Sequence, residues 1–182
     1  MKTATRDDAD LVALARAGDL DAFEVLVRRH TPSVYAHALR FFGNPTAADD
    51  IVQEVFIKVY RGLDSFDERS KFSTWLYRIA RNACLDHVRA GARRPVPIDP
   101  LSVTAAAPGD LSDQVALSTS VEAAMRALAP EDRDALSAVA LFGLSYAEAA
   151  DVLGVPSGTV KSRVFRARRT LTATLGLTKG GA

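Results

Sequence analysis

Residues 144–169 read Leu-Ser-Tyr-Ala-Glu-Ala-Ala-Asp-Val-Leu-Gly-Val-Pro-Ser-Gly-Thr-Val-Lys-Ser-Arg-Val-Phe-Arg-Ala-Arg-Arg, a pattern that predicts two helices joined by a tight turn. Ser145 and Glu148 are spaced as a capping box, in which each side chain bonds the other residue's backbone N–H. Gly154 ends the first helix, because glycine adopts the left-handed conformation without a Cβ penalty. Ser157 is expected to cap the second helix. The pattern predicts a helix-turn-helix, whose second helix enters a DNA major groove.

The charge pattern of the C-terminal part supports this interpretation. From Ser157 onward the sequence contains no acidic residue, and its basic residues are Lys161, Arg163, Arg166, Arg168, Arg169 and Lys179. A helix of one charge sign is typical of phosphate contact. A solvated basic face on an ordinary helical hairpin would explain the charge but not the caps and the turn. The net charge of the whole chain is only +1, which predicts low non-specific DNA affinity and help from another component.

Length and composition narrow the class of protein further. The chain has 182 residues, enough for one domain or two small ones, and Cys84 is its only cysteine. A single cysteine excludes an internal disulfide and suits a reducing compartment. No stretch approaches the roughly 18 apolar residues of a membrane-spanning helix, and the N-terminus lacks the apolar core of a signal peptide. We therefore expect a cytoplasmic protein that does not insert into a membrane.

Helical periodicity and breaker residues predict an all-α protein of two small domains joined by a flexible linker. In the first domain, helices are expected over residues 7–17, from residue 19 or 21, from a restart at Thr31-Pro32 to Phe42, from a capping box at Thr46, and from about residue 70 to 90. Residues 91–113 contain four prolines and no helical period, which indicates a linker. The expected segments are a domain at 1–90, a linker at 91–116, a helix-turn-helix domain at 117–177 and a tail at 178–182, with no further regulatory domain after Leu177.

Some polar and aromatic residues are open to two interpretations from spacing alone. The helix after Thr46 has one broad apolar face, and its other face, with Gln53 and Glu54, is interpreted as solvated surface. Trp75 is expected in the core, because Phe72 and Ile79 share its helix face. Cys84 and His87 also share a face, but two further zinc ligands are missing, so no metal site is expected.

Four strings in this order resemble bacterial extracytoplasmic-function sigma factors, which keep only the second and fourth conserved regions of the primary sigma factor. They are Asp-Asp-Ile-Val-Gln-Glu-Val-Phe at 49–56, Phe-Ser-Thr-Trp-Leu-Tyr-Arg-Ile-Ala-Arg-Asn at 72–82, Leu-Ser-Tyr-Ala-Glu-Ala-Ala at 144–150 and Gly-Thr-Val-Lys-Ser-Arg-Val-Phe-Arg-Ala-Arg at 158–168. The resemblance covers about residues 10–90 and 117–175. Together the strings are highly specific, whereas each alone is only moderately so.

The resemblance implies roles that spacing alone does not show. It assigns docking on the β′ subunit of core RNA polymerase to Asp49, Asp50, Gln53 and Glu54, which reverses the solvated-face interpretation, and it implies the β′ and β subunits as partners. It assigns recognition of the promoter's minus-ten element to Phe66, Ser70, Lys71, Arg78, Arg81 and Asn82. It assigns recognition of the minus-thirty-five element to Ser157, Thr159, Lys161, Ser162, Arg163, Phe165, Arg166 and Arg169.

The implied function is a transcription initiation factor that helps to open the promoter. Capturing a flipped base costs a few kcal/mol, which an aromatic stacking surface such as Phe66 and an edge-reading amide such as Asn82 could return. The implied partners are core polymerase, promoter DNA and an anti-sigma factor. No enzymatic activity, cofactor or small-molecule substrate is implied.

Two other functions are open to test. A free-standing regulator would use only the helix-turn-helix, with a ligand-sensing first domain, and would bind duplex DNA tightly without polymerase. An enzyme built on the first helical bundle would need clustered titratable groups there, and the sequence offers none. Whether the two domains pack together in the free protein is also left open.

Overall fold

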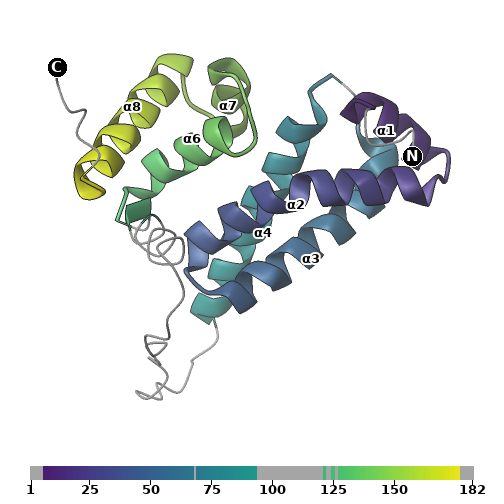
Figure 1. The fold of residues 1–182 in the computed structure, drawn as a ribbon, viewed down its shortest axis with the longest axis horizontal. Helices are drawn as coiled ribbons and strands as arrows, with labels where there is room; N and C mark the ends of the chain where they lie inside the picture. The colour runs from purple at the N-terminus through teal and green to yellow at the C-terminus, as the bar shows by residue number, and fades with distance from the viewer. Residues whose placement is uncertain (1–5, 68, 94–120, 122–123, 126, 177–182) are drawn as a thin grey trace.

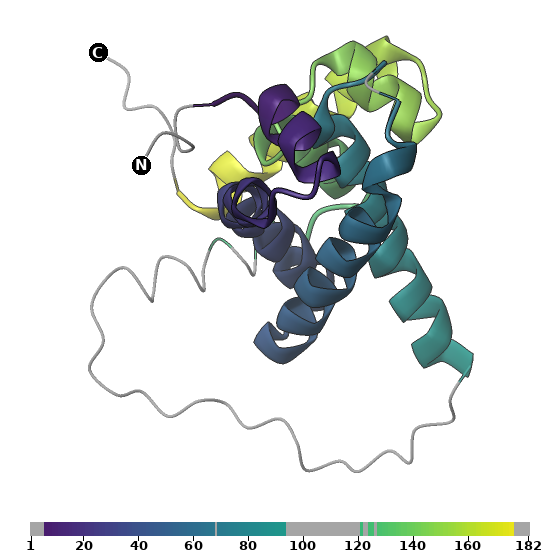
Figure 2. The ribbon, with the colours of Figure 1, turned by 90° about the vertical axis from the view of Figure 1, so that its right-hand side faces the viewer.

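A computed structural model describes residues 6–67, 69–93, 121, 124, 125 and 127–176 (Figures 1 and 2). Within these residues the secondary structure is helical throughout, which confirms the predicted all-α class. One group of helices is formed by the N-terminal half of the chain and a second by the C-terminal part. In this described part of the chain no helix is long and apolar enough to cross a membrane.

The N-terminal group is a bundle of three long helices with a short one across one end. Its elements are α1 (Asp8–Arg16), α2 (Leu20–Phe42), α3 (Pro45–Gly62), the 3₁₀ turn η1 (Leu63–Ser65) and α4 (Phe72–Arg93). The apolar stripe of α3 faces α2 and α4, and Ile51, Val55 and Val59 are fully buried there. Trp75 packs on Phe66 and Phe72, as expected of a core residue.

Helix α2 runs without a break through Pro32, where the sequence predicted a restart. The prediction was wrong because the proline rule is local, whereas packing favours one helix. Leu26 precedes Pro32 and Val34 and Ala38 follow it, yet all three are fully buried on the same bundle face. Keeping these side chains in one core compensates for the backbone hydrogen bond that proline cannot donate.

Two predicted helix caps are also displaced. Helix α3 is capped by Asn44, whose side chain accepts from the backbone N–H groups of Thr46 and Ala47, with Pro45 as the first helical residue. This arrangement satisfies free N–H groups with a cap two residues earlier than the predicted box at Thr46. In the second motif, Ser157 is the first residue of its helix and makes no capping bond, because the preceding Pro156 occupies the cap position.

The C-terminal group contains α6 (Pro130–Ala140), α7 (Tyr146–Leu153) and α8 (Ser157–Thr174). Helices α7 and α8 form the predicted helix-turn-helix. Ser145 and Glu148 make the reciprocal capping box, and Gly154 ends α7 with a left-handed φ of 67°. Val160 and Val164 of α8 are buried, which fixes the second helix of the motif on the first.

Part of the predicted organisation falls outside the described residues. Helix α4 continues to Arg93, three residues beyond the expected end of the first domain at residue 90. The rest of the predicted linker, the first residues of the domain expected at 117–177, and the tail at 178–182 are not among the described residues.

The two groups of helices pack directly against each other, which answers the question that the sequence left open. Phe142, which follows α6, has its ring centroid 5.0 Å from that of Tyr77 on α4 and 5.9 Å from that of His37 on α2. Beside this aromatic cluster, the Ser33 hydroxyl donates to the carbonyl of Leu141 at 2.7 Å. We call this contact between the two helix groups the seam, and its three rings, those of His37, Tyr77 and Phe142, are nearly inaccessible to solvent.

Candidate nucleic-acid interface

The second helix of the helix-turn-helix presents a basic, partly aromatic surface. Lys161, Ser162 and Phe165 project from α8 as exposed residues, and Phe165 keeps 66% of its surface in solvent. A hollow of about 410 Å³ lies between them and Tyr146 at the start of α7. An exposed phenylalanine beside hydrogen-bonding and cationic groups suits the floor of a major groove, where thymine methyl groups alternate with polar base edges.

The other residues predicted to face the minus-thirty-five element differ in exposure. Ser157 and Arg169 are exposed at either end of α8, whereas Thr159 and Arg163 are half-buried. Arg166 makes a two-pronged ion pair with Asp132 of α6, with Nη2 at 2.7 Å and Nε at 3.1 Å from the carboxylate oxygens. The hydrogen bonds to Asp132 raise the pKa of Arg166. The planar fork of Arg166 is thus already engaged within the domain.

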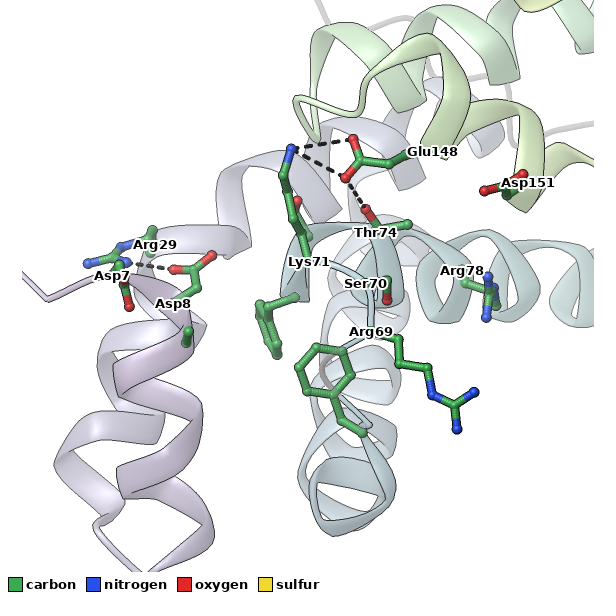
Figure 3. A pocket seen from close by; sticks show the side chains of 14 residues that line it. Asp7, Asp8, Arg29, Arg69, Ser70, Lys71, Thr74, Arg78, Glu148 and Asp151 are labelled. Carbon is green, nitrogen blue, oxygen red and sulfur yellow. Dashed lines mark hydrogen bonds and ion pairs between the residues drawn. The ribbon is translucent and has the colours of Figure 1, made fainter. Parts of the chain in front are cut away.

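A second candidate surface surrounds a cavity of about 960 Å³ at the junction of the two helix groups (Figure 3). Its basic wall residues are Arg29, Arg69, Lys71 and Arg78, and its acidic ones are Asp7, Asp8, Glu148 and Asp151. The cavity brings together Phe66, Ser70, Lys71 and Arg78, four of the six residues predicted to contact the minus-ten element. Asn82 is exposed farther along α4, and Arg81 points at the neighbouring α6.

The placement of Phe66 departs from the exposed stacking surface that the sequence predicted. Only 4% of Phe66 is exposed, and its ring packs against Trp75 with a centroid distance of 5.0 Å. Arg16 of α1 holds this turn from behind, donating to the carbonyls of Leu63, at 2.9 Å, and of Phe66. Phe66 therefore serves as a wall of the cavity, because its ring face is occupied by Trp75.

Two basic residues, one on α4 and one directly before it, are bound by carboxylates of the C-terminal group. Lys71, just before α4, lies 3.3 Å from a carboxylate oxygen of Glu148 on α7. Arg81 donates from Nε to Asp134 of α6 at 3.0 Å, and both side chains are largely withdrawn from solvent. Burial raises the pKa of Asp134, and the guanidinium of Arg81 only partly offsets that effect. The pKa of Glu148 is lowered, first by its bond to the Ser145 backbone N–H and further by Lys71.

The outward face of α3 carries the residues predicted to dock on polymerase. Asp49, Asp50 and Gln53 are exposed, and Glu54 pairs with Lys58 of the same helix at 2.6 Å. The same outward face also has an apolar part, which the predicted polar face did not include. Ile57 and Tyr60 each expose about half of their surface there. Their spacing from Gln53 by one and two helical turns could have placed them on the polar face.

A small ionic cluster beside the cavity was also missed by sequence reasoning. Asp8 bonds His30 at 2.8 Å and Arg29 at 2.6 Å, which ties α1 to α2. Burial would raise the pKa of Asp8, but the bonds and charges of His30 and Arg29 outweigh it and leave the pKa lowered. Asp8 is more than 20 positions from its two adjacent partners, so no local pattern signals the cluster.

Metal-binding chemistry has little support in the described residues. They contain no group of three or more histidine, cysteine, aspartate or glutamate side chains arranged to hold a metal. Cys84 is fully buried, and this burial raises the pKa of its thiol to about 12, which disfavours the thiolate that a metal would need.

Comparisons with known proteins match both helix groups. The family model for sigma-70 region 2 matches residues 26–94, and that for sigma-70 region 4 matches residues 118–171. The chain is 38% identical over 177 residues to the ECF RNA polymerase sigma factor SigM of Mycobacterium tuberculosis, covering 97% of this chain and 88% of SigM. It is 39% identical over 178 residues to the ECF RNA polymerase sigma-E factor of Escherichia coli, covering 90% and 92% of the two chains.

Solved structures with similar folds include two complexes. CnrH, in complex with the cytosolic domain of CnrY, superposes with a TM-score of 0.69 and 29% identity, covering 94% of this chain and 99% of CnrH. The sigma factor RpoE of Bartonella quintana, in complex with the anti-sigma factor NepR, gives a TM-score of 0.66 and 28% identity, with coverages of 86% and 98%.

Proposed function

The chain belongs to the extracytoplasmic-function sigma factors of bacterial RNA polymerase, and we propose that it directs core polymerase to promoters and helps to melt them. One observation carries the proposal for this particular chain. The chain has an exposed basic helix, α8, and also a second surface lined by cations around α4, next to a cavity with an aromatic wall. A promoter with two separated elements needs two such surfaces on one chain. The competing free-standing regulator needs only the first.

In this proposal residues 1–90 form the domain that docks on polymerase and captures the minus-ten element. Asp49, Asp50, Gln53 and Glu54 would dock on the β′ subunit, a role implied by the family resemblance and supported by their place on the outward face of α3. The exposed apolar pair Ile57 and Tyr60 continues that face and would be covered by the partner. Apolar residues at the centre of a docking face supply much of the binding energy of an interface.

Lys71, Arg78, Arg81 and Asn82 would hold the backbone and base edges of the minus-ten strand. The cavity beside them, with Phe66 and Ser70 in its wall, would take an unstacked base. Since unstacking costs a few kcal/mol, the cavity must return it through apolar contact and edge hydrogen bonds. Its volume of about 960 Å³ leaves room for such a group.

Residues 117–177 would form the domain that reads the minus-thirty-five element through α8, with residues 91–116 as the tether. Lys161, Ser162 and Phe165 are placed to read the groove, and Ser157 and Arg169 to contact flanking phosphates. We expect Arg166 to position the helix through Asp132 as well as to contact DNA. The polymerase would supply catalysis and most of the DNA affinity, which agrees with the small net charge of the chain.

The proposal extends to location and regulation. Because its partner polymerase works on chromosomal DNA, we propose that the chain acts in the cytoplasm. The two complexes with similar folds, one with an anti-sigma factor and one with a cytosolic domain, support an anti-sigma factor as a further partner.

Transcription by reconstituted holoenzyme tests this function. Bacterial core polymerase and the chain are incubated with a library of random promoter inserts, and the 5′ ends of the transcripts are sequenced. We expect start sites that share two upstream motifs, and their loss with Gln53→Ala/Glu54→Ala. Asp86→Ala, which removes an exposed acid of α4 away from the α3 face, serves as the control. Tight duplex binding by the chain alone, without any polymerase-dependent start sites, would support the free-standing regulator.

A further inference from the structure

The face of α4 that is proposed to hold the minus-ten strand is covered by the chain's own C-terminal helices. Glu148 of α7 lies over Lys71 and Thr74, and Asp151 lies near Arg78 on the same side (Figure 3). Farther along α4, Asp134 of α6 bonds Arg81. We propose that the α6–α7 surface competes with the minus-ten strand for α4, so that the free chain holds this DNA site closed. This inference rests on the proposed function, because that function assigns α4 to DNA.

The chemistry of the contact resembles that of a DNA backbone. A carboxylate and a phosphate are both anionic acceptors, and each makes charge-assisted hydrogen bonds with lysine and arginine. Asp134 and Glu148 thus occupy donors of Arg81 and Lys71 that a phosphate would otherwise take. A phosphate and a carboxylate cannot use the same donor at once, so DNA that binds through Arg81 Nε or the engaged Lys71 donors must break these contacts.

Steric exclusion adds to the electrostatic competition. Thr74, Tyr77, Arg78 and Arg81 are spaced by three or four residues and therefore form one stripe along α4. In this stripe Tyr77 has no exposed surface and Thr74 only 3%, because α6 and α7 lie directly on them. The Tyr77 hydroxyl donates to the backbone carbonyl of Asp134 at 3.0 Å. A DNA strand therefore cannot reach the middle of the stripe until the two helix groups separate.

The closed seam has a measurable thermodynamic consequence. When only the open fraction of the chain can bind, the apparent dissociation constant rises in inverse proportion to that fraction. Any substitution that weakens the seam should therefore tighten binding of single-stranded DNA, even if it lies far from α4. By reciprocity, single-stranded DNA should open the chain.

Ser33 offers the cleanest perturbation of the seam. Its hydroxyl bonds Leu141 at 2.7 Å, it carries no charge, and it is not among the residues proposed to touch DNA. A hydrogen bond of this kind contributes about 1 kcal/mol, which corresponds to roughly a fivefold change in the opening equilibrium. Asp134→Asn removes the ion pair to Arg81 and should open the chain by at least about tenfold. Glu131→Gln is the charge-matched control, an exposed residue of the same helix α6.

The experiment follows closure directly in the full-length chain. Donor and acceptor dyes are placed at exposed positions on the two helix groups through Ala13→Cys and Thr170→Cys, while the native Cys84 is fully buried. Energy transfer is recorded as a 12-nucleotide single strand of thymidines is added, and binding is followed separately by the anisotropy of a labelled strand. Strand bound only at α8 leaves the transfer unchanged, so the transfer signal isolates the competition at α4.

We expect one state of high energy transfer without DNA, and a fall in transfer when the strand is added. The strand concentration at the midpoint of this fall should be about fivefold lower for Ser33→Ala than for the unmodified chain. Glu131→Gln should behave like the unmodified chain. The proposal is overturned if the strand saturates the chain without a shift, if the chain is already open without DNA, or if the opened variants fail to bind. Polymerase is absent throughout. If the energy-transfer experiment fails but promoter-dependent transcription succeeds, only the proposed competition for α4 is refuted. If the transfer shifts but no transcription is found, the sigma function is refuted, and the contact between the two helix groups stands.

Discussion

Acidification should destabilise the protein through one residue, His37, at the seam between the two helix groups. His37 is 2% exposed, and its ring lies among those of Phe41, Tyr77 and Phe142. Burial lowers the pKa of His37 from 6.5 to about 3, and three arginines, Arg40 on its own helix, Arg81 on α4 and Arg133 on α6, lower it further. The native histidine therefore stays neutral at every pH at which the protein is handled.

The sign and size of the effect follow from linkage between protonation and folding. Well above pH 6.5 His37 is neutral in both the native and the unfolded chain, so its contribution to stability is complete. Below pH 6.5 the unfolded chain takes up a proton that the native chain cannot, and stability falls as the pH falls towards the native pKa. Between pH 7.5 and pH 5.0 the loss is about 2 kcal/mol. Any native pKa below about 4 gives nearly the same loss, because the native histidine is then neutral at pH 5.0.

The assay compares unfolding by urea at pH 7.5 and pH 5.0, followed by helical circular dichroism. His37→Leu fills a similar volume without a titratable group, so the variant should lose about 2 kcal/mol less than the unmodified chain on acidification. Val88→Gln serves as the control, because Val88 is exposed and the substitution changes no titratable group, so the pH dependence should stay as it is in the unmodified chain. Equal losses of stability in the unmodified chain and His37→Leu would refute the reasoning.

Three further predictions concern the candidate site. Ser145→Ala should lower the free energy of unfolding by about 1 kcal/mol, measured by thermal denaturation, whereas Ser157→Ala, which removes no capping bond, should change it by less than about 0.5 kcal/mol. Phe165→Ala should leave the melting temperature unchanged because the ring is 66% exposed, yet weaken holoenzyme binding to the minus-thirty-five element, measured by footprinting. Arg16→Lys keeps a charge but loses the planar fork that holds the turn at Phe66, and should reduce minus-ten base capture roughly tenfold, measured by 2-aminopurine fluorescence.

The helix-turn-helix could be predicted from sequence because its determinants are local. The capping box pairs Ser145 with Glu148, three residues apart, and Gly154 needs only its own backbone conformation to end α7. Periodicity likewise placed Ile51, Val55 and Val59 on the buried side of α3, since helical spacing sets which residues share a face, but Tyr60 at the edge of that stripe is about half exposed. Local rules failed where packing opposed them. Pro32 predicted a break in α2, but the apolar residues on both sides of it share one core.

The geometry of the site depends on hydrogen bonds between residues far apart in the sequence, which sequence patterns do not predict. Arg16 holds a turn about 50 residues away, and Ser33 bonds Leu141 more than 100 residues away. Neither partner carries a motif, because the acceptors are backbone carbonyls that any residue provides. For the same reason Phe66 could be predicted as part of the cavity but not as a buried wall. Its exposure is set by Trp75 behind it and not by its own neighbours in sequence.

Two aspartates of helix α6 each hold an arginine of another helix. Asp132 and Asp134 are two positions apart and therefore project from different sides of the helix. Asp132 reaches Arg166 on α8, and Asp134 reaches Arg81 on α4, so one helix places a carboxylate on an arginine of each proposed DNA-reading helix. The two pairs differ in what opening does to them. The Asp132 pair lies within the C-terminal group and persists when the groups separate, whereas the Asp134 pair spans the seam and must break. If α6 serves to hold α4 closed, neutralising Asp134 should release the minus-ten surface without altering α8. Neutralising Asp132 should instead free Arg166 on α8 and leave the minus-ten surface covered.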